Sequence, residues 1–234
     1  RELAIRPEMT PSVTRMVSRI YETSPKPLRL FSIANFLRNE KPQKGRNREF
    51  WQLNCDVFGS NSLMADVEII QLSIEIMKEF GATKDQFIVY YNDRRLIEAI
   101  VTDFLKADAS KVSEATRILD KFGKINNDEL ILRLKQEVSA KIDNATIFLD
   151  FLNLQEDAFE YVYQNYLKEN EGIKDLMQIA NKLEALGYGD YIKYNPSMVR
   201  GFDYYDGMIF EVYDRKDYLK RTGVLKTDDS FRSL

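Results

Sequence analysis

The sequence contains no histidine, and this absence excludes several classes of active site. Hydrolases that pair a serine or cysteine nucleophile with histidine are excluded, as are a histidine general base and HExxH metal sites. Cys55 is the single cysteine, so the usual zinc sites and an internal disulfide are excluded too. The remaining polar residue types suit phosphoryl and nucleotidyl transfer, in which positioning and charge stabilisation supply the rate.

Long apolar runs are also missing. No stretch approaches the roughly 18 residues that a membrane span requires, and the first residues, RELAIRPEMT, carry charge where a secretory signal would be apolar. The chain begins with arginine rather than methionine, which is compatible with a start inside a longer protein. With 234 residues, 44% of them hydrophobic, the sequence predicts a globular chain of one large domain or two smaller ones. The single cysteine suggests a reducing compartment, and we expect a cytoplasmic protein.

A basic stretch, FLRNEKPQKGRNREFWQLNCDVFG at 36–59, stands out against the net charge of -3. Apolar and aromatic residues on both sides of a Pro/Lys/Gly turn predict two antiparallel strands, over 26–40 and 48–58, joined by a loop. Between positions 26 and 48, Glu40 is the one carboxylate beside seven cations, which are Lys26, Arg29, Arg38, Lys41, Lys44, Arg46 and Arg48. Such a concentration of positive charge needs an anionic partner.

Helices are predicted on both sides of this hairpin. Apolar residues recur every three or four positions over 13–21, which predicts an amphipathic helix with Thr10 as N-cap and Glu8 near its positive end. A second helix is predicted over 63–80, with an N-cap in 60–62, and a short strand over 86–91. Residues 94–187 contain no proline and predict successive helices of a helical subdomain. An aromatic stripe there is typical of a core and consists of Phe148, Phe151, Phe159, Tyr163 and Tyr166.

The stretch YNPSMVRGFDYYDGMIFEVY at 194–213 predicts a further hairpin. Arg200-Gly201 ends its first extended segment, and Asp206-Gly207, a strong turn dipeptide, opens the second. The turn holds an arginine, an acid and two tyrosines. On spacing alone, a structural role and a functional role for this cluster both stay open.

Three blocks together resemble the catalytic core of histidyl-tRNA synthetase, a class II aminoacyl-tRNA synthetase. They are IRPEMTPSVTR, FLRNEKPQKGRNREFWQLNCDVFG and MVRGFDYYDGMIFE, in the order of the family and separated by helices where the family has an insertion. The middle block resembles motif 2 of the class II fold, and the last resembles the histidine-specific arginine signature. The resemblance implies an α+β fold with an antiparallel sheet flanked by helices, divided into 1–93, 94–187 and 188–234.

The same resemblance implies ATP-dependent activation of histidine and its transfer to tRNA(His), a step of protein biosynthesis, with Mg²⁺ expected beside ATP. It implies that Arg38 binds the α-phosphate of ATP and that Arg200 lies between this phosphate and the carboxylate of the amino acid. Glu40 would help to hold the adenine. Arg46 and Arg48 would face the outer phosphates or the end of the tRNA.

For histidine, the resemblance implies that Glu8 and Thr10 take the α-amino group and that Gln52 also contacts the amino acid. Asp56 and Tyr205 would recognise the imidazole ring, with Tyr204 in the same pocket. Two departures from the family pattern stand out, because Met9 replaces a common glycine and Asp56 replaces the glutamate of many bacterial members.

Parts of the family pattern are not found in the sequence. Nothing resembles motif 1, which supplies the homodimer interface in the family, or motif 3 or the anticodon-binding domain. We therefore expect residues 1–234 alone to activate histidine poorly.

Two alternatives stay open. One is a synthetase-like regulatory protein that binds histidine beside ATP phosphoribosyltransferase, although such a protein needs no clamp for an α-phosphate. The other is a nucleic-acid-binding module that uses the basic turn.

Overall fold

The computed structural model describes residues 5–41, 47–143, 145–199 and 205–215. The chain folds as two units, Arg1–Ala65 and Asp66–Leu234. The predicted limits of a helical insertion, at 94 and 187, stay a prediction. No helix in the described ranges is both long and apolar enough to span a bilayer.

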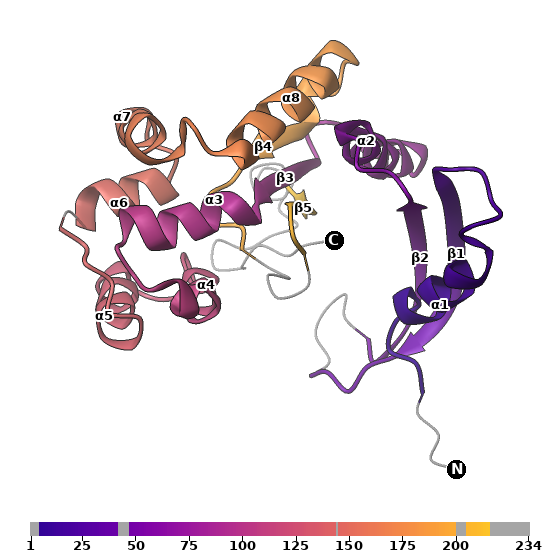
Figure 1. Cartoon of the computed structure of the whole chain (residues 1–234), viewed down its shortest axis with the longest axis horizontal. Coiled ribbons are helices and arrows are strands. Elements are labelled where there is room, and N and C mark those ends of the chain that lie inside the picture. The colour runs from indigo at the N-terminus through magenta and orange to yellow at the C-terminus, as the bar shows by residue number, and fades with distance from the viewer. Residues whose placement is uncertain (1–4, 42–46, 144, 200–204, 216–234) are drawn as a thin grey trace. The chain divides into compact units, whose positions relative to one another are not determined.

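Two long strands form the hairpin of the first unit (Figure 1). Strand β1 (Leu28–Leu37) runs antiparallel to β2 (Glu49–Phe58), with Leu28 opposite Phe58 and Leu37 opposite Glu49. The predicted hairpin is confirmed, with the strands shorter than predicted. The loop residues 42–46, which include Arg46, lie outside the described residues.

Alternation along the strands gives this hairpin two different faces. The face that we call the inner face carries Leu28, Leu30, Ser32, Ala34, Phe36, Phe50, Gln52, Asn54, Asp56 and Phe58. Ala34 and Phe36 are buried there. The opposite, outer face carries Phe31 and Trp51, whose exposed fractions are 74% and 71%. The polar residues of the inner face are therefore less accessible to solvent than these two aromatic residues of the outer face.

Helix α1 (Thr10–Ile20) precedes the hairpin and buries Val13 and Val17. The predicted helix is confirmed, but the prediction that Thr10 is its N-cap is wrong. The cap position is Met9, which makes no side-chain hydrogen bond. Its carbonyl oxygen instead accepts hydrogen bonds from the backbone N–H groups of Ser12 and Val13, at 2.9 and 3.0 Å, so the helix already includes Thr10.

Helix α2 (Leu63–Glu79) follows the hairpin as its N-cap signal predicted. The Ser62 hydroxyl accepts a hydrogen bond from the backbone N–H of Met64 at 3.2 Å, which satisfies one donor of the first turn. After the helix, Gly81 takes φ +84°, a backbone conformation that glycine adopts at low cost.

The second unit contains a sheet of three strands in the order β4-β3-β5 (Figure 1). The central strand β3 (Phe87–Asp93) pairs in parallel with β4 (Ile192–Tyr194) and antiparallel with β5 (Met208–Asp214). The predicted hairpin over 194–213 is therefore wrong, because β4 ends at Tyr194, residues 195–199 form no strand, and β5 pairs with β3 instead. The Asp206-Gly207 signal marks the start of β5 and not a turn between paired strands.

The helices of the second unit confirm the predicted helical stretch. They are α3 (Arg94–Ala99), continued by a π-helical turn over Ile100–Phe104, α4 (Val112–Leu119), α5 (Asn127–Glu137), α6 (Ala145–Leu152), α7 (Glu156–Val162), continued by a π-helical turn over Tyr163–Leu167, and α8 (Glu171–Ala185). Short 3₁₀ turns cover Ala109–Lys111 and Gly189–Tyr191.

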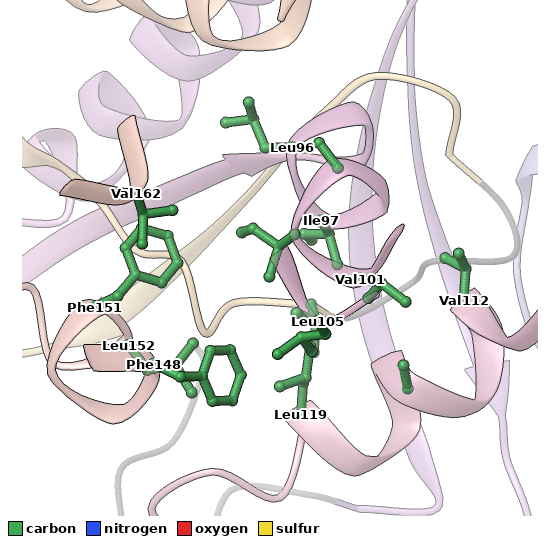
Figure 2. Packing of buried hydrophobic residues seen from close by; sticks show 14 of the residues in the cluster. Leu96, Ile97, Val101, Leu105, Val112, Leu119, Phe148, Phe151, Leu152 and Val162 are labelled. Atoms are coloured by element: carbon green, nitrogen blue, oxygen red, sulfur yellow. The ribbon is translucent and has the colours of Figure 1, made fainter. Parts of the chain in front are cut away.

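These helices share one hydrophobic core. Figure 2 shows side chains of this core, among them Leu96 and Ile97 of α3 and Phe148 and Phe151 of α6, and all four are fully buried. The rings of Phe159, Tyr163 and Tyr166 are partly buried and pack against this core. The aromatic stripe is therefore structural, as its helical spacing predicted.

Candidate functional site

The end of β1 is tied to the N-terminal block by Arg38. Its backbone N–H donates to the carbonyl oxygen of Arg48 at 2.8 Å, which extends the hairpin by one more bond. Its side-chain Nε–H donates to the carbonyl oxygen of Pro7 at 3.0 Å. The guanidinium carbon also lies 5.0 Å from the centre of the Phe50 ring on the inner face. The structure thus joins Arg38, which is predicted to bind the α-phosphate, to the N-terminal block that is predicted to bind the amino acid.

A second guanidinium lies over the same end of the inner face. The Arg6 side chain lies 5.5 Å from the centre of the Phe36 ring, and the rings of Phe36 and Phe50 are 6.0 Å apart. Cations over aromatic faces are attracted by the ring electrons, so both arginines are held in defined places. This end of the hairpin is therefore cationic, and the Arg38 side chain is 39% exposed and accessible to an anion.

Glu40 and Arg48 lie beside Arg38. An Nη nitrogen of Arg38 lies 4.0 Å from the Glu40 carboxylate, and the Arg48 Nε–H donates to the backbone carbonyl of Glu40 at 3.2 Å. Three of the four residues predicted to contact ATP are therefore neighbours. The fourth, Arg46, lies outside the described residues.

Of the two residues of the N-terminal block predicted to bind histidine, Glu8 is next in the chain to a residue of this cationic end. Glu8 and Thr10 are half-buried, and Glu8 directly follows Pro7, whose carbonyl binds Arg38. Gln52 occupies the inner face next to the Phe36 and Phe50 pair, opposite the buried Ala34.

Further along the inner face lies Asp56, opposite Leu30. Burial raises the pKa of its carboxyl group. One of its oxygens, Oδ2, is buried without a hydrogen-bond partner among the described residues. The pKa of the Cys55 thiol is raised as well, by burial and then by the Asp56 charge. The predicted role of Asp56, recognition of the imidazole ring, stays a prediction.

In the second unit, Tyr205 lies just before β5. Its carbonyl oxygen accepts a hydrogen bond from a terminal nitrogen of Arg94 at 3.1 Å, and its side chain is 48% exposed. The backbone N–H of Arg94 donates to Gly207 at 3.1 Å, which joins α3 to the start of β5. Arg200 and Tyr204 lie outside the described residues, so their predicted roles stay predictions.

Asn92 is a buried residue that the sequence analysis missed. Its side-chain amide donates to the carbonyl oxygens of Pro196 and Met198, at 3.3 and 3.0 Å. The backbone N–H of Asn195 donates to Tyr91 at 3.0 Å. Together these bonds hold the segment that leads to Arg200. The signal in the sequence was a polar residue at the end of an apolar strand.

A buried ion pair lies next to Asn92. The Asp93 carboxylate, fully buried, accepts hydrogen bonds from the backbone N–H, Nε and Nη2 of Arg95, at 2.9, 2.9 and 2.7 Å. Arg95 also pairs with Asp175 of α8 at 2.8 Å. Burial, together with the Asp93 and Asp175 charges, raises the pKa of Asp66 in α2, although Arg95 opposes this. The two ion pairs of Arg95 join the end of β3 and the start of α3 to α8 in the second unit.

Metal-binding residues do not gather in the part of the chain that the structure describes. None of its aspartates, glutamates and Cys55 form a group of three or more that suits a metal ion. A resident metal cage is thus not seen among these residues.

Comparison with known proteins identifies the family. The family model described as Histidyl-tRNA synthetase matches residues 1–224. The histidine--tRNA ligase of Leptospira biflexa is 39% identical over 230 residues, which cover 95% of this chain and 50% of that protein. The chain spans about half the length of the curated relatives it matches.

Two solved structures show the same fold. Histidyl-tRNA synthetase from Nostoc sp. PCC 7120 matches with a TM-score of 0.73 at 20% identity, over 88% of this chain and 48% of that one. An ATP phosphoribosyltransferase regulatory subunit/histidyl-tRNA synthetase from Bacillus halodurans C matches with a TM-score of 0.74 at 23% identity, over 90% and 54%. This chain belongs to the histidyl-tRNA synthetase family and has the fold of a class II synthetase.

Proposed function

We propose that the protein that carries this chain activates histidine with ATP and transfers it to tRNA(His). The family membership supports this proposal. The observation that carries it within the structure is the hydrogen bond from Arg38 to Pro7, because it unites the predicted phosphate ligand with the predicted amino-acid block. The inner face of the hairpin is then the floor of the substrate site.

The activation step brings two anions together. One oxygen of the histidine carboxylate attacks the α-phosphorus of ATP, the bond from this phosphorus to pyrophosphate breaks, and pyrophosphate leaves with the electron pair. Negative charge grows on the phosphoryl oxygens in the transition state. A guanidinium at the position of Arg38 stabilises that charge with paired N–H donors, which a lysine does not offer.

Histidine would lie along the inner face, with its carboxylate toward Arg38 and its ring toward Asp56. Gln52 lies between these two ends on the same face. The ring would be surrounded by an acid and other polar groups. An amino acid without ring nitrogens would leave these groups without hydrogen-bond partners. Such a site discriminates by roughly 10⁴.

The remaining substrates and partners are part of the same proposal. Mg²⁺ commonly binds through substrate phosphates and only one or two carboxylates, so it would arrive with ATP. Arg48 would face the outer phosphates or the end of tRNA(His). The roles of Arg200, Tyr204 and Tyr205, the homodimer and the cytoplasmic location follow from the family resemblance and stay predictions.

A second candidate is a regulatory protein of the histidine pathway. It is supported by the name of the Bacillus halodurans neighbour, an ATP phosphoribosyltransferase regulatory subunit/histidyl-tRNA synthetase, whose likeness shows the fold alone. A regulatory protein would bind histidine without joining it to ATP. The contact between Arg38 and the N-terminal block favours the ligase.

Exchange of labelled pyrophosphate into ATP separates the candidates. In the full-length protein, we expect exchange that depends on histidine. Histidine binding without exchange would favour the regulatory protein. An RNA affinity that falls steeply with salt, with no response to histidine or ATP, would favour a nucleic-acid-binding module.

A further inference from the structure

Ser32 and Asn54 face each other in the middle of the inner face of the hairpin. The Ser32 hydroxyl oxygen and the Asn54 amide oxygen are both buried, and neither has a hydrogen-bond partner among the described residues. Asp56 Oδ2, one residue pair further along the same face, is likewise buried without a hydrogen-bond partner among the described residues. Three such atoms thus lie on two neighbouring pairs of one face.

Unpartnered buried polar atoms are rare, because each loses its bonds to water without replacement. Of the four such side-chain atoms in the described residues, three belong to this patch, and the fourth is the Tyr194 hydroxyl in the second unit. The concentration of three on one hairpin face points to a ligand that completes their hydrogen bonds.

The position of the pair agrees with the proposed direction of the substrate. The Cα atoms of residues two apart on a strand are about 7 Å from each other. The Cα atoms of Gln52 and Asp56 are therefore about 13 Å apart, with Asn54 midway. A ligand that is held by both Gln52 and Asp56 therefore passes over Asn54. Directly opposite, Ser32 is within reach of the same ligand, since paired side chains are about 5 Å apart.

The chemistry of the three oxygens selects the ligand group. The carboxylate oxygen of Asp56 and the amide oxygen of Asn54 accept hydrogen bonds, and the Ser32 hydroxyl both accepts and donates. An imidazole fits this set, because its N–H groups donate to the carboxylate and amide oxygens and an unprotonated ring nitrogen accepts from the Ser32 hydroxyl. A ligand carboxylate would be repelled. The carboxylate of an amino acid suits the opposite, cationic end at Arg38 and Arg6.

We propose that Ser32 and Asn54 determine specificity by forming hydrogen bonds with the imidazole of histidine, beside Asp56. This proposal rests on the proposed function and adds two residues to its ring pocket. Ser32 and Asn54 form hydrogen bonds with the ring next to Asp56, whose side chain is one methylene shorter than that of glutamate. The shorter acid thereby gains two polar neighbours.

Ser32→Ala and Asn54→Ala in the full-length protein test the proposal. Pyrophosphate exchange is measured with histidine and with histidine methylated on either ring nitrogen. We expect each variant to raise KM for histidine about tenfold, the effect of losing one hydrogen bond, with KM for ATP unchanged. The preference for histidine over at least one methylated form should shrink by a similar factor.

Thermal unfolding without ligand separates this role from a structural one. The removed atoms are unpartnered in the absence of substrate, so the unfolding temperature of Ser32→Ala should stay the same or rise. Asn35→Ala, on the outer face of the same strand, is the matched control and should leave KM for histidine unchanged.

Unchanged KM and unchanged preference in both Ser32→Ala and Asn54→Ala would overturn the proposal while leaving the ligase function in place. Wild-type protein with no histidine-dependent exchange would instead overturn the proposed function itself. A third outcome is a lower unfolding temperature of Ser32→Ala together with an equal loss of exchange activity for histidine and both methylated histidines. That result would give the pair a role in stability and would also overturn the proposal.

Discussion

The Nε–H of Arg38 donates to the carbonyl oxygen of Pro7 at 3.0 Å, across 31 positions of sequence. This bond and the Phe50 ring fix the direction of the guanidinium. The charge at the end of β1 is therefore oriented before any substrate binds. Preorganised charge of this kind is what phosphoryl transfer requires.

Replacing Arg38 tests this orientation. Arg38→Lys keeps a charge but loses the paired donors, and Arg38→Ala loses both. We expect Arg38→Ala to lower the rate of histidine-dependent exchange by on the order of 3 kcal/mol, or roughly a hundredfold, and Arg38→Lys to recover only part of it. Steady-state exchange kinetics measure both. Arg29→Ala, on the outer face of the same strand, is the control, and an equal loss there would contradict a specific role for Arg38.

Asp56→Asn tests the buried acid of the inner face. Because the pKa of Asp56 is raised in the folded state, folding favours its protonated form, and ionisation lowers the stability as pH rises above the ordinary value of 3.8. The variant removes this penalty. Without ligand, we expect it to be more stable than wild type at pH 7, with the difference vanishing below about pH 3.8.

Urea unfolding of wild type and Asp56→Asn between pH 3 and pH 8 measures this difference. Glu49→Gln provides a matched change on the outer face of the same strand, where Glu49 is exposed. The same Asp56 variant should bind histidine more weakly. A variant that is less stable than wild type at pH 7 without ligand would show that Asp56 has a structural partner instead.

Asn92→Ala tests the support of the segment before Arg200. The change leaves two backbone carbonyls without their buried donor, so we expect a loss of about 1 to 3 kcal/mol in the free energy of unfolding. If this segment positions Arg200, kcat for exchange should also fall.

Thr116→Val provides the comparison for Asn92→Ala. Thr116 is buried, and its hydroxyl donates to the carbonyl of Val112 within α4, at 2.8 Å. We expect this variant to lose about 1 kcal/mol of stability and to keep kcat. Equal kcat in the Asn92 and Thr116 variants would refute the positioning role of Asn92.

Gly172→Ala tests the buried ion pair. A Cβ at Gly172 would lie 2.9 Å from the Asp93 carboxylate and 2.9 Å from the Asn170 amide oxygen. Because Asp93 is held by Arg95, the clash is not easily relieved, and we expect a loss of about 1 to 3 kcal/mol. A Cβ at Gly207 meets nothing within 4 Å, so Gly207→Ala should unfold at the wild-type temperature in circular dichroism. Equal unfolding temperatures for the two variants would contradict the close packing at Gly172.

Local signals predicted the local elements of this chain. The β1 and β2 hairpin has a turn composition that its own residues determine, and α2 has a serine cap and a closing glycine. Thr10 was misjudged by one position, because the Met9 carbonyl can begin the helix without any capping side chain. Turns, caps and helix starts of this kind depend on interactions between residues a few positions apart.

Long-range pairing was not predictable from the same signals. The strand β5 pairs with β3, more than 110 positions away, and no nearby residue reveals this partner. Asn92 and Asp93 looked like ordinary polar residues at the end of a strand, because their partners at Met198 and Asp175 come from distant elements. In the sequence, Ser32 and Asn54 were visible only as two of the polar residues that share this face with Gln52 and Asp56.

The most direct test of the account is a crystal structure of the full-length protein with a nonreactive analogue of histidyl-adenylate. We expect density for the imidazole over Ser32, Asn54 and Asp56, and for the phosphoryl group within hydrogen-bond distance of Arg38. An analogue bound elsewhere, with the inner face of the hairpin vacant, would contradict it.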